Sequence, residues 1–228
     1  MSGKGQPNWE KQLIWDWPVR VCHWLLVLCF VGAWFTAESE RWRLVHVTLG
    51  YTMVGLVVFR VLWGVVGTRH ARFASFVRAP AAVLRYARSL LTLQPQPYAG
   101  HNPVGGLAVI VLLGLVLITA GTGHLSYNDT AGEWAEEMHE ALAAVMLAVV
   151  IVHVIGVTLT SFLHRENLIG AMITGHKTAE PGAAIRWSFL WMAAVILAFV
   201  LGFWWTQWHS AVQIRKAASP VVMRGPES

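Results

Sequence analysis

Ten histidines occur in this 228-residue sequence, and four of them lie within or at the edge of long apolar blocks. An ionisable side chain inside a membrane-spanning segment is costly, so each of these four is a candidate functional group. Imidazole ligates metal ions and exchanges protons near neutral pH, so both kinds of chemistry are open to it. The four residues are His23, His46, His139 and His153.

The spacing of these histidines places them at two depths. His139 and His153 are 14 positions apart, almost four helical turns, and project from nearly the same face of one helix about 21 Å apart. His23 precedes the end of its apolar block by 13 positions and is level with His153, whereas His46 is level with His139. The sequence therefore predicts an inner pair, His23 with His153, and an outer pair, His46 with His139.

Each pair is suited to ligate one haem iron. A bis-histidine haem needs one imidazole on each side of the porphyrin plane, and a helix bundle supplies them from facing helices. Gly50 and Gly156, one turn from His46 and His153, would let the flat macrocycle approach the backbone, although glycine also serves close helix packing. The lack of a CxxCH sequence excludes covalent c-type haem, so two haems b are predicted. The alternatives are histidines that only pack, and a transporter or proton relay without iron.

The other six histidines are predicted to be peripheral. His164 lies beside Arg165 and Glu166 and is expected to be an interfacial residue. A contact between His101 and a quinone is the less favoured alternative to a solvated side chain. Five histidines near span ends or in loops are expected to be solvated, namely His70, His101, His124, His176 and His209.

Five apolar blocks must position these side chains. The chain is 56% hydrophobic and 13% charged, whereas soluble domains carry about 25% charged residues. A helix of roughly 20 apolar residues crosses a bilayer. We therefore expect an all-α integral membrane protein, a four-helix transmembrane bundle holding two haems, plus a fifth transmembrane helix and a short cytoplasmic amphipathic helix at 81–93. The predicted spans are 18–36, 44–66, 103–122, 139–163 and 187–206.

The distribution of Lys and Arg predicts the orientation. Of the 17 basic residues, 12 fall on the side of the N-terminus and the other five on the opposite side. Loops rich in Lys and Arg stay in the cytoplasm, so the N-terminus is predicted to be cytoplasmic. The opposite side carries an acidic loop, 129–137. The net charge of +5 is accordingly assigned to contact with anionic membrane lipid, not to nucleic acid.

Three arginines near span ends are predicted to bind haem propionates. Arg20 and Arg60 lie on the inner side, and Arg43 lies on the outer side. A guanidinium forms strong paired hydrogen bonds with a carboxylate. Snorkelling toward the membrane surface is the alternative for each of them. One-electron transfer needs no nucleophile or general base, so no catalytic side chain is predicted.

Eight segments of the chain carry a family resemblance. They are WPVRVCHW (17–24), HVTLGY (46–51), RVLWG (60–64), RHARF (69–73), GHNPVGG (100–106), HE (139–140), HVIG (153–156) and AMITGHK (171–177). Together they resemble the bacterial di-haem cytochrome b family, which includes the cytochrome b(561) type and the cytochrome b subunits of nickel-iron hydrogenases. The resemblance covers roughly residues 14–178 and implies haem ligation by the same four histidines. It implies one transmembrane cytochrome b domain, 1–228, with an extra helix at 187–206.

The family resemblance also implies a function. An electron-transfer oxidoreductase subunit of a respiratory chain in the bacterial inner membrane would pass electrons between the quinone pool and a periplasmic redox partner. That partner would be a c-type cytochrome, a flavocytochrome or a hydrogenase-like subunit, and the acidic loop would face it. The alternative is a self-contained superoxide:quinone oxidoreductase, which the acidic loop disfavours because superoxide is an anion. The oligomeric state stays open, and a homodimer is compatible with the sequence.

Overall fold

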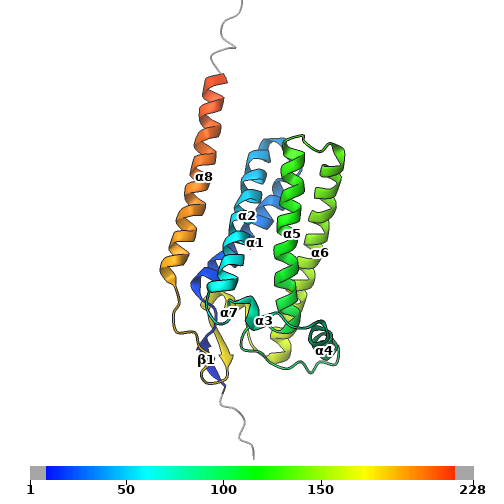
Figure 1. Ribbon diagram of the computed structural model, residues 1–228, viewed down its shortest axis with the longest axis vertical. Helices are drawn as coiled ribbons and strands as arrows, with labels where there is room; N and C mark the ends of the chain where they lie inside the picture. Colours follow the sequence, from blue (N-terminus) through cyan, green and yellow to red (C-terminus); the bar gives the residue numbers. More distant parts are fainter. Residues whose placement is uncertain (1–8, 219–228) are drawn as a thin grey trace, which may run out of the picture.

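Five long helices form the body of the protein in the computed structural model, which describes residues 9–218 (Figure 1). All five are long and apolar enough to cross a membrane, so the chain is a multi-pass membrane protein, as predicted. Four of them lie together as a bundle, and the fifth stands beside it. The helices are α1 (Trp17–Thr36), α2 (Arg43–Val66), α5 (Pro103–Tyr127), α6 (Glu133–His164) and α8 (Leu190–Ala218).

The bundle consists of two antiparallel helix pairs. α1 packs along α2, and α5 packs along α6, while α2 and α5 join the two pairs. A short 3-10 turn, η1 (Glu40–Trp42), connects the first pair. α1 and α6 make almost no direct contact, although both carry predicted haem ligands. α1 and α6 are therefore held apart within the bundle by α2 and α5.

Cap residues define where two of the helices begin. The Asp16 carboxylate accepts a hydrogen bond from the Val19 amide at the start of α1, and Asn102 caps α5 in the same way through the Gly105 amide. A proline follows each cap, where its fixed φ angle suits the first turn and its missing N–H is not needed. The first turn of each helix is thus fixed in position. This also fixes the depth of every side chain that the two helices carry.

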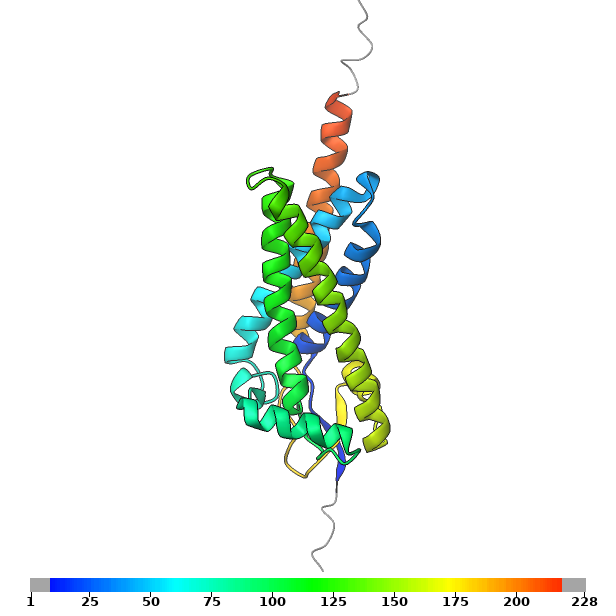
Figure 2. The same ribbon diagram turned by 90° about the vertical axis from the view of Figure 1, so that its right-hand side faces the viewer.

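One end of the bundle is covered by short elements, which we call the inner layer (Figure 2). The amphipathic helix predicted at 81–93 is α4 (Pro80–Leu91), which lies across the end of the bundle. The sequence did not predict the other members, because elements of four to seven residues show no clear periodicity. These are α3 (Phe73–Phe76), α7 (Leu168–Thr174) and an antiparallel sheet of β1 (Glu10–Leu13) with β2 (His176–Ala179), in which Glu10 pairs with Ala179.

The buried carboxylate of Asp16 ties the inner layer together. Its Oδ2 accepts hydrogen bonds from Trp63 Nε1 at 3.0 Å and from Thr68 Oγ1 at 2.6 Å. The start of α1 is thereby joined to the end of α2. Gly175, with φ of +84°, ends α7 in the left-handed region, and its carbonyl accepts the amides of residues 14 and 15. These bonds connect the N-terminal segment with α7, which follows it by about 160 positions in the chain.

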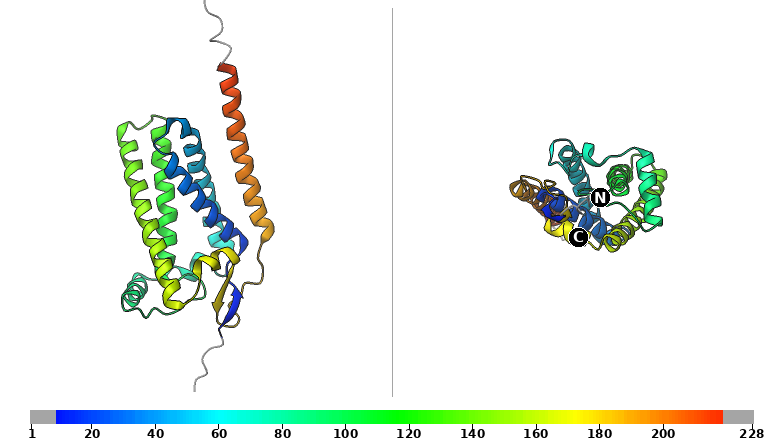
Figure 3. Two further views of the ribbon diagram at one scale, coloured as in Figure 1. Left: turned by 180° about the vertical axis from the view of Figure 1, so that it is seen from behind. Right: turned by 90° about the horizontal axis from the view of Figure 1, so that it is seen from below.

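The fifth helix differs from its predicted bounds of 187–206. It begins at Leu190 and continues to Ala218, so that it extends beyond the bundle at the outer end (Figure 3). The apolar run ends near Thr206, but a helix does not have to end where its membrane span ends. The helix packs on α1, and Trp204 Nε1 donates to Thr52 Oγ1 of α2 at 2.9 Å.

Candidate haem site

The structure brings the rings of the outer pair of histidines close together. His46 of α2 and His139 of α6 have ring centres 6.0 Å apart, with their ring planes inclined by 76°. An imidazole nitrogen binds a transition metal at about 2 Å, so two imidazoles on opposite sides of one metal have ring centres roughly 6 Å apart. The spacing of His46 and His139 therefore suits the two axial ligands of one iron.

Hydrogen bonds select the tautomer of both outer histidines. His46 Nδ1 lies 2.9 Å from the Ala33 carbonyl of α1, and His139 Nδ1 lies 2.8 Å from the Thr119 carbonyl of α5. A carbonyl oxygen only accepts, so each Nδ1 carries the proton and each Nε2 keeps a free lone pair. Metal-ligating histidines commonly donate their second nitrogen to such a carbonyl, which orients the ring and raises its basicity.

Close packing holds the His139 ring in this orientation. A Cβ atom at Gly123 of α5 would lie 2.8 Å from both Nδ1 and Cε1 of His139. Any larger residue at this position would therefore displace the ring. Gly123 is a functional position that the sequence analysis missed, because nothing in the local sequence shows which helix faces His139.

The inner pair occupies the second level of the bundle. His23 lies on α1 and His153 lies on α6. The Trp24 ring meets the His23 ring edge-on with ring centres 5.2 Å apart. His23 Nδ1 is buried and has no hydrogen-bond partner among the residues that the structure describes. Because α6 is an unbroken helix, His153 lies about 21 Å along its axis from His139.

Two glycines border open space beside the ligands. A Cβ at Gly50, one turn from His46, would meet no atom within 4 Å, and the same holds at Gly156, one turn from His153. Both positions are half-buried, on the same helix faces as the ligands. This room next to each ligand is what a flat macrocycle needs, and it agrees with the role predicted for both glycines.

Arg60 is a buried cation that forms no direct ion pair in the described part of the chain, although the Asp16 carboxylate is near enough to act on its charge. Only 6% of the side chain is exposed, and its Nη1 has no hydrogen-bond partner there. The guanidinium lies over the rings of Phe73 and Phe76, at 5.2 Å and 5.9 Å. A buried charge is strongly unfavourable unless an opposite charge and hydrogen bonds compensate it. The surroundings of Arg60 therefore fit the carboxylates of a haem.

The other two arginines have different surroundings. Arg20 is buried, lies 4.0 Å over the Trp17 ring and donates through Nε to the Met172 carbonyl of α7 at 3.4 Å. Arg43 lies at the outer end of α2, 3.5 Å from Glu40, and both side chains are exposed. It is one helical turn from His46.

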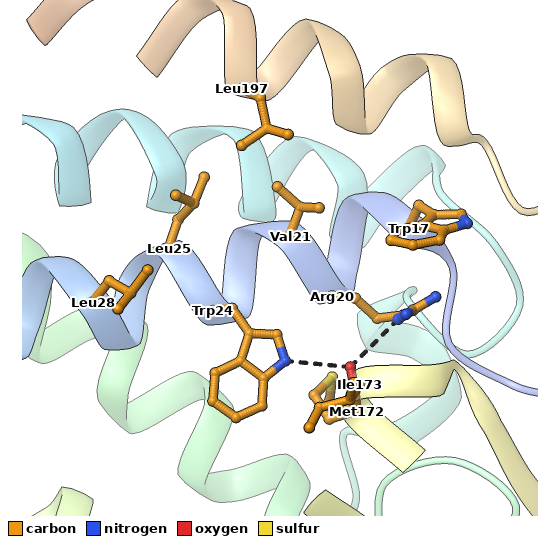
Figure 4. A pocket seen from close by; sticks show the side chains of 9 residues that line it. All are labelled: Trp17, Arg20, Val21, Trp24, Leu25, Leu28, Met172, Ile173 and Leu197. Carbon is orange, nitrogen blue, oxygen red and sulfur yellow. Dashed lines mark hydrogen bonds between the residues drawn. The ribbon is translucent and has the colours of Figure 1, made fainter. Parts of the chain in front are cut away.

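A pocket of 230 Å³ opens beside Arg20, between α1, α7 and α8 (Figure 4). Arg20 and Trp24 both point toward the Met172 carbonyl, which accepts hydrogen bonds from each of them. The remaining walls are apolar side chains, including Leu28 and Leu197. Because most of its walls are apolar, this pocket suits an aliphatic chain better than a polar headgroup.

Two histidines predicted to be solvated lie instead within the inner layer. His70 is buried, and its Nε2 donates to the Ala183 carbonyl at 2.7 Å. His101 has a buried Nδ1 without a partner in the described chain. Burial, together with the nearby charges of Arg60 and Lys177, lowers the pKa of His101 to about 3. The solvated prediction was wrong for both residues, because the segments that cover them are distant in the sequence.

The candidate ligands come in pairs and not in larger clusters. Among residues 9–218, no group of three or more His, Cys, Asp or Glu side chains is placed to hold a bare metal ion. Cys22 and Cys29 are both buried as free thiols. Opposed imidazoles with space beside them suit a macrocycle that supplies the remaining four ligands itself.

The comparisons with known proteins agree with this geometry. Residues 14–175 match the family described as prokaryotic cytochrome b561. The chain belongs to this family. The cytochrome is therefore a multi-pass membrane electron-transfer protein of the b type, which implies haem b as its cofactor, and the four histidines, the two glycines and Arg60 fit that group.

Three relatives of the cytochrome carry the description "Probable Ni/Fe-hydrogenase B-type cytochrome subunit". The relative from Rhodobacter capsulatus is 23% identical over 213 residues, which cover 72% of this chain and 80% of the relative. The one from Rhizobium leguminosarum is 24% identical, with 76% and 92% covered. The one from Azotobacter vinelandii is 27% identical, with 77% and 93% covered. No solved structure shows significant similarity to the cytochrome.

Proposed function

We propose that this cytochrome carries electrons between the quinone pool and a redox partner on the outer side of the bacterial inner membrane through two haems b. His23 and His153 would ligate the inner haem, and His46 and His139 the outer haem. The observation that carries the proposal is the outer pair, with rings 6.0 Å apart and both Nε2 atoms free for the metal.

The protein's contribution is to hold its ligands at fixed depths. When bound, haem iron supplies reversible one-electron chemistry. α6 provides one ligand to each level, so its helical rise sets their separation at about 21 Å. The carbonyls of Ala33 and Thr119 orient the outer imidazoles. The buried apolar surroundings exclude water and thereby limit reorganisation when the charge of the site changes.

The arginines would hold the propionates. Arg60 has the strongest support, because it is buried and forms no direct ion pair in the described chain. Arg43 is suited to the outer haem through its place one turn from His46. Arg20 is suited to the inner haem, since it lies on α1 one turn before His23.

The partner would approach the end of the bundle opposite the inner layer. With a cytoplasmic N-terminus, the acidic segment 129–137 at the start of α6 lies outside, where it would meet a basic surface. The names of the relatives favour a hydrogenase-like subunit as partner. A lipid-soluble quinone would exchange electrons from within the membrane.

Haem quantification of the purified protein tests the ligand assignment. Pyridine haemochrome analysis should give two haems b per chain. His46→Ala and His139→Ala should each leave one haem, and His23→Ala should remove the other. His124→Ala is the matched control, because His124 is exposed on α5 and bonds to Tyr51, and it should keep both haems. One haem or none in the unaltered protein would contradict the proposal.

Reduction kinetics test the electron path. Quinol should reduce both haems in membranes, and an added partner should reoxidise them. Replacing Glu133, Glu136 and Glu137 by Gln should slow the partner step and leave both haem spectra intact. Unchanged partner kinetics would argue against this docking face. Fast reduction by superoxide with no partner present would favour the self-contained oxidoreductase.

A further inference from the structure

His101 is held firmly in the inner layer although no residue of the described chain uses its Nδ1 atom. The imidazole lies between two aromatic rings, with centres 4.6 Å from Trp15 and 4.4 Å from Phe76. It comes from the segment that precedes α5, and Trp15 comes from the segment that precedes α1. Two distant parts of the chain therefore cooperate to fix this ring.

The backbone around His101 is fixed on both sides. Asn102 caps α5 through the Gly105 amide at 2.7 Å. The ammonium group of Lys177 in β2 donates a hydrogen bond to the Tyr98 carbonyl, and its Nζ atom also lies 3.4 Å from the Gly100 carbonyl oxygen. A mobile histidine could turn to water, but this one has a defined position. Its unpartnered nitrogen therefore requires a physical explanation, because an unsatisfied buried donor costs about 1–3 kcal/mol.

The Phe76 side chain contacts both His101 and Arg60 and so brings them close together. It contacts the His101 ring at 4.4 Å and underlies the Arg60 guanidinium at 5.9 Å. A Cβ at Gly106 would lie 2.8 Å from the Phe76 carbonyl, so α5 packs directly on Phe76. Arg60 Nη1, like His101 Nδ1, is buried and unpartnered within the described residues. Two unused donors thus flank the same aromatic side chain.

The charges around His101 define what these donors would bind. The cationic side chains of Arg60 and Lys177 are close enough for their charges to act on its imidazole, and the neutral rings of His23 and His153 lie in the same region. The two cations favour an anion over a cation at this place. His23 and His153 are the proposed inner haem ligands, and a haem carries two carboxylates at one edge of its ring. A neutral imidazole donates one hydrogen bond to a carboxylate, and a guanidinium donates two.

We propose that His101 and Arg60 together bind the propionate carboxylates of the inner haem, with His101 donating through Nδ1. This inference rests on the proposed ligation of the inner haem by His23 and His153. In this proposal His101 binds the cofactor directly, through a hydrogen bond to a propionate. The Arg60 guanidinium also places a positive charge beside the propionates, and the N–H dipole of neutral His101 acts in the same sense, so both favour the reduced state of the iron.

Substitutions that separate packing from hydrogen bonding test the proposal. His101→Phe keeps a ring between Trp15 and Phe76 but removes the donor, whereas His101→Gln keeps a donor. Redox titration should show a lower midpoint potential for one haem in His101→Phe, with partial recovery in His101→Gln. The haem that is absent in His23→Ala identifies the inner one. His70→Phe is the control for the same layer, since its ring nitrogen already bonds to Ala183, and it should leave both potentials unchanged.

The cofactor itself provides a second comparison that needs no substitution. The unaltered protein, reconstituted with haem whose propionates are methyl esters, should lose its inner haem to a haem acceptor roughly 10-fold faster than with native haem. With the ester, His101→Phe should no longer change the inner potential, because the acceptor of its hydrogen bond is altered already.

Three results would overturn the proposal. The first is an unchanged inner potential in His101→Phe with both haems present. The second is an equal shift with the ester and with native haem, which would place the effect outside the propionates. The third is slower quinone reduction in His101→Phe at unchanged potentials, which would assign His101 to the quinone. Fewer than two haems in the unaltered protein would instead count against the proposed function, so the two failures are distinguishable.

Discussion

His46 and His139 face each other from α2 and α6 with ring centres 6.0 Å apart, and each directs its Nδ1 to a carbonyl of a third or fourth helix. All four helices of the bundle therefore contribute to this level. α2 and α6 supply the rings, while α1 and α5 supply the carbonyls that orient them. A shift of any one helix would disturb the pair, so the geometry of the outer site depends on the correct packing of all four helices.

The packing of Gly123 on His139 leads to a first prediction. Gly123→Ala should displace the His139 ring, since the new Cβ would lie 2.8 Å from two of its atoms. Overpacking of this kind costs about 1–3 kcal/mol. The occupancy and absorption spectrum of one haem should change. Gly121→Ala on the exposed face of α5 meets nothing within 4 Å and should behave like the unaltered protein. Equal spectra for both variants would contradict this arrangement.

The room at Gly50 leads to a second prediction. A leucine there would extend into the space beside His46 and compete with the macrocycle. Gly50→Leu should lower haem content toward one per chain, as measured by pyridine haemochrome analysis, without unfolding the helices. Gly55→Leu adds the same side chain on an exposed part of α2 and serves as the control. Two haems in Gly50→Leu would place the macrocycle elsewhere.

The bonds of Asp16 predict its contribution to stability. Asp16→Ala removes the cap of α1 and leaves Trp63 Nε1 and Thr68 Oγ1 without their acceptor. A lost cap costs about 1 kcal/mol, and each lost hydrogen bond a further ~1 kcal/mol. Thermal unfolding in detergent should occur at a clearly lower temperature. Glu38→Ala, at an exposed turn, should have little effect. An equal loss in both variants would contradict this role of Asp16.

Cysteine labelling tests the predicted orientation. The two native cysteines are fully buried, so they give little background. Thr130→Cys, in the turn between α5 and α6, should react with a membrane-impermeant maleimide on spheroplasts. Thr92→Cys, at the end of α4, should react only after the membrane is opened. The reverse pattern would invert the topology and place the partner face in the cytoplasm.

The burial of His70 predicts a pH dependence. Burial lowers its pKa below the ordinary value of 6.5, with further lowering by Arg69 and Lys177 and an opposing effect of the Ala183 hydrogen bond. Between the two pKa values the unfolded chain binds more protons than the folded one, so stability falls as the pH drops below about 6.5. Unfolding measured from about pH 7.5 to 5 should show this loss, and His70→Gln should reduce its slope. An unaltered slope in His70→Gln, or a reduced one in the exposed control His124→Gln, would assign the effect elsewhere.

The sequence determined the helices and the depth of the histidines. Long apolar blocks specify membrane helices because the bilayer leaves few other ways to satisfy the backbone. The rise of a helix is constant, so the interval from His139 to His153 fixes their separation whatever surrounds them. For the same reason the level shared by His46 and His139 was predictable. The end of α8 was not, because helical structure continues past Thr206 without an apolar signal.

Only the tertiary structure decided which partners the histidines meet. The carbonyls of Ala33 and Thr119, the close approach of Gly123 and the burial of His101 all join segments that are distant in the chain. The inner layer has short elements whose local sequence gives no periodic signal. His101 looked like a loop residue because its covering rings, Trp15 and Phe76, come from two other segments. Such contacts depend on how helices and loops pack together, which spacing along one helix does not specify.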